Sequence, residues 1–176
     1  SLDSPLTKTG RRQAREAAKI LRDMNEKPDF IVHSHLSRAR DTAEILNEVL
    51  GVPLREDPDL AEIHAGDLEG QPWEKCRNFD AWADMANGER FEDFFVRVRR
   101  AKKRILETET GLPLIVSHGG VFRAFGKIYG VEVPGVIRNC HLHEFTPVEE
   151  KEKSFPWDVW HYDYKKTIVR LRAKSY

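Results

Sequence analysis

At residues 114–120 the sequence reads Leu-Ile-Val-Ser-His-Gly-Gly, a short apolar run followed at once by polar residues and two glycines. This pattern is typical of a buried strand that leads into a helix. Residues 30–34, Phe-Ile-Val-His-Ser, show it again, and a helical stripe of Ala43, Leu46 and Leu50 follows them. Strands that alternate with helices predict a three-layer α/β/α sandwich around a mixed, mostly parallel sheet.

Outward from these two strands, spacing and turn residues predict the other elements. Thr9 is expected to cap a first helix that ends before Pro28, and Gly51 is expected to end the second helix. A third, long amphipathic helix is expected to carry apolar residues from Phe91 to Ile105. The remaining expectations are a short strand at 54–56, a polar loop at 57–70, irregular and helical pieces at 71–87, a helix at 119–129, and late strands at 140–146, 157–162 and 167–172. Residues 1–176 are expected to form one domain.

The overall charge argues against nucleic acid and anionic membranes as partners. The chain has 29 Lys and Arg against 29 Asp and Glu, so its formal net charge is zero. A neutral chain has no global field that would attract a polyanion. The basic run from Arg97 to Arg104 is expected to lie on the solvated side of the long helix. No apolar run approaches the length that spans a membrane.

The two cysteines, Cys76 and Cys140, have neither metal-ligand spacing nor the pattern of a disulfide framework. They are expected to be free thiols in a reducing compartment, which predicts a cytoplasmic protein. His33 and His35 alternate at a strand end but lack nearby partner ligands, so no metal site and no cofactor are expected.

Four residues near the strand ends can bind an anion. Ligands of α/β proteins gather at the carboxyl ends of strands, where helix N-termini favour negative charge. Gly119 and Gly120 would let backbone N–H groups approach such an anion, Arg38 offers a planar fork of donors, and His118 can donate a hydrogen bond or move a proton. Taken singly, Arg38 is better explained as a surface cation and His118 as a core histidine.

Six short motifs occur in one order between residues 4 and about 145. They are Pro5-Leu6-Thr7 with Gly10 and Gln13-Ala14; Ser34, Leu36, Arg38, Ala39, Thr42 and Ala43; Leu60, Glu62, Gly66, Glu69 and Gly70; Gly88-Glu89; Ser117-His118-Gly119-Gly120; and Asn139. In this order the chain resembles the histidine phosphatase (phosphoglycerate mutase-like) superfamily over nearly its whole length.

The resemblance implies an enzyme in which a histidine attacks phosphorus and forms a phosphohistidine. It implies that Glu62 is the general acid and base, that His118 is the second histidine of the phosphate pocket, and that Arg38 is a phosphate ligand. Gly119 is expected to bind substrate through its backbone, and His64, two residues after the acid, is expected to touch substrate. Glu69, the nearest competitor for the acid, is assigned a structural part.

The sequence departs from the family in one respect. The family's nucleophile lies in an Arg-His-Gly motif upstream of the Pro-Leu-Thr stretch, and none of the seven histidines of this chain has that context. We therefore expect that a native segment with the first, central strand precedes Ser1, because its absence would leave a hole in the core. The chain as written is predicted to be inactive alone, and a catalytically dead member that binds a phosphorylated ligand is the alternative.

The compact spacing between Glu62 and His118 resembles the phosphatase branch rather than the mutases, which carry a long insertion there. The expected function is hydrolysis of a phosphate monoester, with a small phosphorylated metabolite as substrate, and phosphoglycerate mutase-type phosphoryl transfer remains the alternative. Trp73, Phe79 and Trp82 either wall the leaving group or anchor the core. The sequence leaves the natural substrate and the oligomeric state open.

Overall fold

The computed structural model describes residues 2–71, 84–107, 110–130, 133, 137–148, 157–164 and 168–172. Its elements are, in chain order, α1 (Lys8–Asp23), β1 (Phe30–His33), α2 (Ser37–Leu50), β2 (Leu54–Glu56), the 3-10 turns η1 (Pro58–Leu60) and η2 (Gly66–Leu68), α3 (Phe91–Glu107), β3 (Pro113–Val116), α4 (Gly119–Ile128), β4 (His143–Pro147), β5 (Trp157–Tyr164) and β6 (Ile168–Arg172). Predictions about Trp73, Cys76, Phe79 and Trp82 lie outside the described residues.

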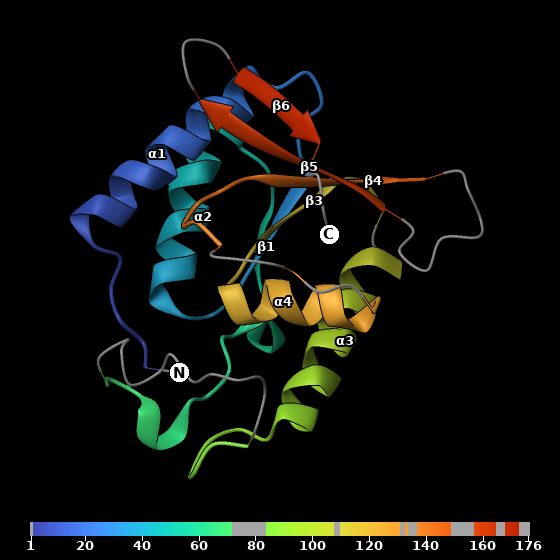
Figure 1. Ribbon diagram of the computed structural model, residues 1–176. Coiled ribbons are helices and arrows are strands. Elements are labelled where there is room, and N and C mark those ends of the chain that lie inside the picture. Colours follow the sequence, from blue (N-terminus) through green and yellow to red (C-terminus); the bar gives the residue numbers. More distant parts are fainter. Residues whose placement is uncertain are drawn as a thin grey trace.

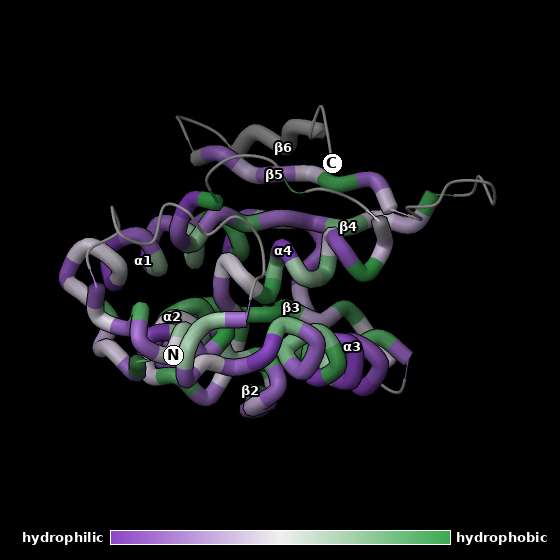
Figure 2. Tube along the Cα trace, turned by 60° about the horizontal axis from the view of Figure 1, so that its bottom comes forward, coloured by the Kyte–Doolittle hydropathy of each residue, from purple (hydrophilic) through white to green (hydrophobic). Residues whose placement is uncertain are grey.

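The strands form two three-stranded sheets (Figure 1). The first is parallel, in the order β2-β1-β3, and Val32 of its central strand pairs with Arg55 on one side and Ile115 on the other. The second is antiparallel, in the order β4-β5-β6, and lies on the side of the molecule opposite β2 (Figure 2). The α/β fold class is confirmed, although the described strands make two sheets where one mixed sheet was expected.

The parallel sheet is buried on both faces because successive side chains of a strand point to opposite sides. On one face, Ile31 belongs to a buried cluster with Leu21 of α1 and Leu46 of α2. On the other face, Phe30 and Val32 belong to a second cluster, which is completed by residues of α3 and α4. The continuous apolar runs in β1 and β3 are therefore the central layer of the sandwich, as Figure 2 shows for β3.

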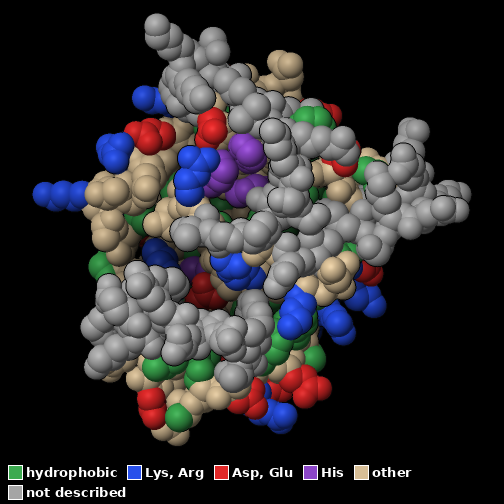
Figure 3. Space-filling model, viewed as in Figure 1, with side chains coloured by type: hydrophobic (Ala, Val, Ile, Leu, Met, Phe, Trp, Pro, Cys, Tyr) green, Lys and Arg blue, Asp and Glu red, His purple; other side chains and the backbone are tan. Residues whose placement is uncertain are grey.

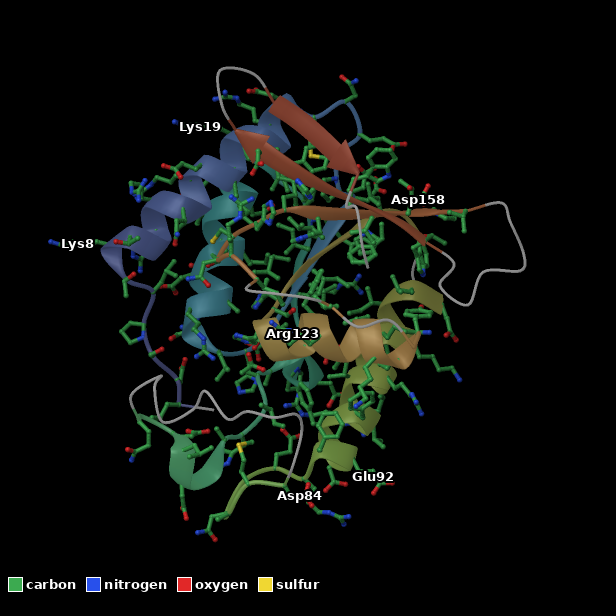
Figure 4. All side chains as sticks on the ribbon, viewed as in Figure 1. Lys8, Lys19, Asp84, Glu92, Arg123 and Asp158 are labelled. Carbon is green, nitrogen blue, oxygen red and sulfur yellow. The ribbon has the colours of Figure 1, made fainter. Side chains whose placement is uncertain are left out.

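The helix ends follow capping chemistry. Gly51 ends α2 with φ 63°, in the left-handed region, as its position after the apolar stripe predicted. The prediction that Thr9 caps the first helix is wrong, because α1 begins two residues earlier and Thr7 accepts a hydrogen bond from Gly10 N–H at 3.0 Å. The polar face of α1 is solvated, and Lys8 and Lys19 project away from the body of the protein (Figure 4).

The basic run on α3 is only partly solvated. Arg99 and Lys103 are exposed, as expected. Arg97, however, is 16% exposed and is bound to other side chains, so the expectation is wrong for this residue. Arg100 is exposed, as expected, and Arg104 is partly exposed, yet both bind carboxylates of the segment that follows β2. The hydrogen bond from Arg100 is the main cause that lowers the pKa of Asp59 to about 2.

Two further observations bear on function. None of the helices in the described part of the chain is long and apolar enough to cross a membrane. Within those same residues there is no group of three or more His, Cys, Asp or Glu side chains placed to hold a metal ion.

Candidate active site

The site lies where β1 and β3 end. Because the two strands are parallel neighbours, the residues that follow them emerge at the same edge of the sheet. Ser34, which is fully buried, follows β1, and its backbone N–H donates to Val116 O at 3.0 Å. His118 follows β3, and its Nε2 lies 2.9 Å from Ser34 Oγ. The two motifs that were quoted from the sequence therefore meet through a direct side-chain contact.

Glu62 reaches the same point from the loop between η1 and η2. Its Oε2 accepts a hydrogen bond from Gly120 N–H at 3.0 Å, and its Oε1 accepts one from Ile63 N–H at 3.0 Å. His118 is the N-cap residue of α4, so the carboxylate lies in the first turn of the helix that His118 opens. A carboxylate in this place satisfies one of the helix's leading N–H groups and is favoured by the helix dipole.

The two glycines of the motif differ in their surroundings. A Cβ on Gly120 would lie 2.1 Å from Glu62 Oε1, so only glycine allows the carboxylate to approach this closely. A Cβ on Gly119 would meet none of the described residues within 4 Å. Gly120 thus holds the carboxylate, while the described part of the fold leaves room beside Gly119.

Arg38 lies at the start of α2 and contacts the first residues of the described chain. Its Nη1 donates to Leu2 O at 2.9 Å, while Ser37 N–H and Ser37 Oγ both donate to Asp3 Oδ1 at 2.7 Å. The charge of Arg38 also acts on His118 and helps to lower its pKa. The leading residues of the chain are thereby fixed beside the candidate site.

His118 is held in its neutral form. Burial is the largest cause that lowers its pKa, to about 3, and the positive charges of Arg38, Arg97 and His35 add to the effect. A histidine in this state can accept or donate one hydrogen bond at each ring nitrogen but carries no charge near pH 7. The structure therefore supplies positive charge at this site through arginine rather than through His118.

The lowered pKa of His118 predicts a loss of stability in acid. Because the unfolded state takes up a proton near pH 6.5 and the folded state does not, the free energy of unfolding falls as the pH drops below about 6.5 and goes on falling toward pH 3. Between pH 7 and pH 5 we expect His118 to account for a loss of about 2 kcal/mol. Urea unfolding at both pH values measures this loss.

His118→Gln should unfold with a smaller difference between the two pH values. His64→Gln, which alters an exposed side chain, is the matched control and should keep the full difference. Equal pH dependence in the wild type and in His118→Gln would contradict a neutral, buried His118.

The remaining predicted residue, His64, lies on the outside of the Glu62 loop. Its side chain is 55% exposed, its Nδ1 accepts from Gly66 N–H at 3.2 Å, and its Nε2 lies 3.7 Å from Glu69 Oε1. Glu69 in turn accepts from Ala65 N–H at 3.0 Å, which agrees with a structural part for that carboxylate. The structure thus brings Glu62, His118 and Gly120 together with Arg38 nearby, whereas His64 braces its own loop.

A second group of histidines lies on the face shown in Figure 3, next to basic side chains. The His141 ring contacts those of His143 and His161, with ring centres 4.6 and 5.3 Å away. Burial lowers the pKa of His141 to about 4 and lowers that of His143, and the His143 ring also contacts Phe122 of α4. These rings pack against one another between β4, β5 and the helix that leads away from His118.

Two residues of the site were missed from the sequence. Ser34 belongs to the second motif, which predicts no role for it, yet its hydroxyl contacts His118. Arg97 was assigned to the solvated side of α3, although it lies three positions after Phe94 and four before Ala101, both buried. That spacing places Arg97 beside the apolar stripe of the helix, and it is the feature of the sequence from which a partly buried Arg97 could be predicted.

The fold and the site define an α/β protein with a polar site at the carboxyl ends of its parallel strands. The chain belongs to the histidine phosphatase superfamily (branch 1), whose sequence profile matches residues 1–160. The family and the phosphoglycerate mutase-like fold that the six motifs indicated are thereby confirmed.

Two relatives illustrate the range of the family. The chain is 37% identical over 123 residues to an uncharacterized phosphatase, PhoE, of Bacillus subtilis, a match that covers 69% of this chain and 63% of that protein. It is 34% identical over 157 residues to a probable phosphoglycerate mutase, GpmB, of Photorhabdus laumondii, covering 80% of this chain and 72% of that one. The chain therefore spans less than two thirds of the length of the first relative.

Solved structures show the same fold. Bacillus stearothermophilus YhfR superposes with a TM-score of 0.72 at 26% identity, over 89% of this chain and 83% of that chain. The mycobacterial glucosyl-3-phosphoglycerate phosphatase Rv2419c superposes with a TM-score of 0.66 at 30% identity, over 90% and 87% of the two chains. Both solved structures thus share the fold of this chain, and the relatives named above are a phosphatase and a probable mutase.

Proposed function

We propose that the protein hydrolyses the phosphate monoester of a small phosphorylated metabolite through a phosphohistidine intermediate. The observation that supports this most is the carboxylate of Glu62 on Gly120 N–H, in the first turn of the helix that His118 opens. A proton donor and a histidine at one helix N-terminus, with an arginine nearby, are groups that phosphoryl transfer needs.

Each residue has a defined task in this proposal. A histidine nitrogen attacks phosphorus, the bond from phosphorus to the leaving oxygen breaks, and Glu62 in its protonated form donates a proton to that oxygen. Water then attacks the phosphohistidine while Glu62 takes up the proton, so the histidine is regenerated and inorganic phosphate leaves. Arg38, His118 and the backbone at Gly119 hold the phosphoryl oxygens during both steps.

The attacking histidine is proposed to come from a segment that precedes Ser1 and carries Arg-His-Gly. Two features support this proposal. Leu2 contacts Arg38, so a preceding segment would start beside the site. Among the described strands, β3 has a hydrogen-bonded neighbour on one side only, so an added strand can pair with its other edge. We call "the extended chain" the protein that consists of residues 1–176 and of the residues encoded directly upstream of Ser1.

Two alternatives remain open to test. The resemblance to GpmB favours phosphoglycerate mutase-type phosphoryl transfer, in which a second hydroxyl replaces water as the acceptor. A protein that binds phosphorylated ligands without turnover is the other. Release of inorganic phosphate indicates the phosphatase, and isomerisation of a phosphoglycerate indicates the mutase. Binding of a phosphorylated ligand without either product indicates the binding protein. We propose a cytoplasmic location for the protein whichever of these three functions it has.

We expect Arg38→Ala to weaken binding of inorganic phosphate to the extended chain by about 10- to 100-fold, since a hydrogen bond between charged groups contributes roughly 1.5–3 kcal/mol. The measurement is the inhibition constant of phosphate against hydrolysis of p-nitrophenyl phosphate. Arg40→Ala is the matched control, because Arg40 is exposed on the same helix. Unchanged inhibition in Arg38→Ala, or equal weakening in both variants, would remove Arg38 from the phosphate pocket.

A further inference from the structure

Arg97 uses its entire guanidinium within the part of the fold that carries Glu62. Arginine has five N–H donors in a fixed planar fork. Its Nη1 donates to Asp59 O and Ala61 O, both at 2.8 Å, and its Nη2 donates to Glu62 O at 3.2 Å. The other two donors go to Glu89, with Nε 2.6 Å from Oε1 and Nη2 2.8 Å from Oε2. These three contacts with main-chain carbonyl oxygens fix the main chain up to the candidate acid itself.

Glu89 closes the arrangement from the other side. Its N–H donates to His64 O at 2.9 Å, and its Oε2 accepts from His64 N–H at 3.3 Å. Arg97 and Glu89 are 16% and 18% exposed, so their pairing is little screened by water. A Cβ on Gly88 would lie 2.8 Å from His64 O, which shows how closely the two segments approach. The chain is therefore held on both sides of Glu62.

We infer that Arg97, paired with Glu89, is a positioning residue that fixes the main chain at Glu62 and so holds its carboxyl group on Gly120. This inference rests on the proposed function, in which Glu62 is the proton donor. Three hydrogen bonds of Arg97 end on carbonyl oxygens of the Glu62 segment, whereas Arg100 and Arg104 bind the side chains of Asp57 and Asp59. Arg97 thus binds the main chain next to Glu62, whereas the other two arginines bind side chains that precede Glu62 in the sequence.

The fork of arginine is essential to this task. Lysine keeps the charge but has a single nitrogen, which can reach at most part of the five acceptors. In the extended chain, Arg97→Lys should lower kcat by about 10- to 100-fold for an alkyl phosphate, since a displacement of roughly 1 Å at a reacting group has effects of that order. For p-nitrophenyl phosphate, whose leaving group needs little protonation, the loss should stay below about 3-fold.

Two comparisons separate positioning from general destabilisation. Arg100→Lys, on the same helix, should change both substrates alike and only slightly. The double variant Arg97→Lys/Glu62→Gln should lose little beyond Glu62→Gln alone, because both changes remove one function. If Arg97→Lys does not fold, Glu89→Gln is the variant to assay, because it weakens the same ion pair. It should also lose more kcat for the alkyl phosphate than for p-nitrophenyl phosphate, but both losses should be smaller than in Arg97→Lys.

The amide proton shift of Gly120 reports the carboxylate position without turnover. It should move in Arg97→Lys in the direction seen for Glu62→Gln and stay unchanged in Arg100→Lys. Equal losses on both substrates, additive losses in the double variant, or an unmoved Gly120 signal would each overturn the inference. If Glu62→Gln itself shows no dependence on the leaving group while the Gly120 signal moves as expected, the failure lies in the role proposed for Glu62, and the positioning role in catalysis fails with it.

Discussion

The chain as written is expected to release no detectable phosphate from any monoester, while the extended chain turns over. The physical reason is that the 176 residues contain no histidine in an Arg-His-Gly context. Loss of a nucleophile lowers kcat by about 10⁶ in a serine protease, where the same two-step logic holds. The measurement is a steady-state assay of both chains against a panel of phosphate monoesters at equal protein concentration.

The matched control for this comparison is the extended chain with its motif histidine changed to glutamine, which restores the missing strand but not the nucleophile. It should be as inactive as the short chain, although it folds with the complete sheet. Full activity in the short chain would show that the nucleophile lies among residues 1–176. An extended chain that binds phosphate but never turns over would favour the binding protein.

The second large effect is expected from Glu62→Gln in the extended chain. Glutamine keeps the size of the side chain and one of its two acceptor oxygens but has no acidic proton to give to the leaving oxygen. General acid catalysis contributes about 10²–10⁴ in rate, so kcat for an alkyl phosphate should fall by that factor. For p-nitrophenyl phosphate the loss should be much smaller, because p-nitrophenolate leaves without protonation.

Glu48→Gln is a suitable control for this variant because Glu48 is exposed on α2, away from Gly120. It should leave both substrates unaffected. A loss that is equal for good and poor leaving groups would show that Glu62 acts through structure or binding and does not donate the proton.

The sequence predicted the structure best where a short local pattern determines the start, the end or the burial of one helix or strand. The apolar run at Phe30-Ile31-Val32 predicted a strand that is buried on both faces, and Ile31 and Val32 indeed belong to opposite clusters. Gly51 predicted the end of a helix because few other residues adopt its backbone conformation. The first helix began at Lys8 instead because Thr7 and Thr9 are equally good capping residues, and only the actual contact with Gly10 distinguishes them.

The interactions that hold the site join residues far apart in sequence, and spacing alone does not predict them. Arg104 pairs with Asp57 across 47 positions, and Arg97 reaches Asp59 O across 38. Glu62 meets Gly120 only because α4 begins at the end of β3, beside the loop that follows β2. The motifs indicated which residues matter, and the parallel pairing of β1 with β3 explains why they meet.

The central claim is that this site passes a phosphoryl group to a histidine upstream of Ser1, with Glu62 as the proton donor. The most direct test is rapid acid-free quench of the extended chain with ³²P-labelled substrate, followed by mapping of the labelled peptide. We expect an acid-labile, alkali-stable phosphohistidine in the Arg-His-Gly peptide, formed faster than steady-state turnover and absent from the glutamine variant of the motif. Turnover without any labelled peptide, or label on His118, would contradict it.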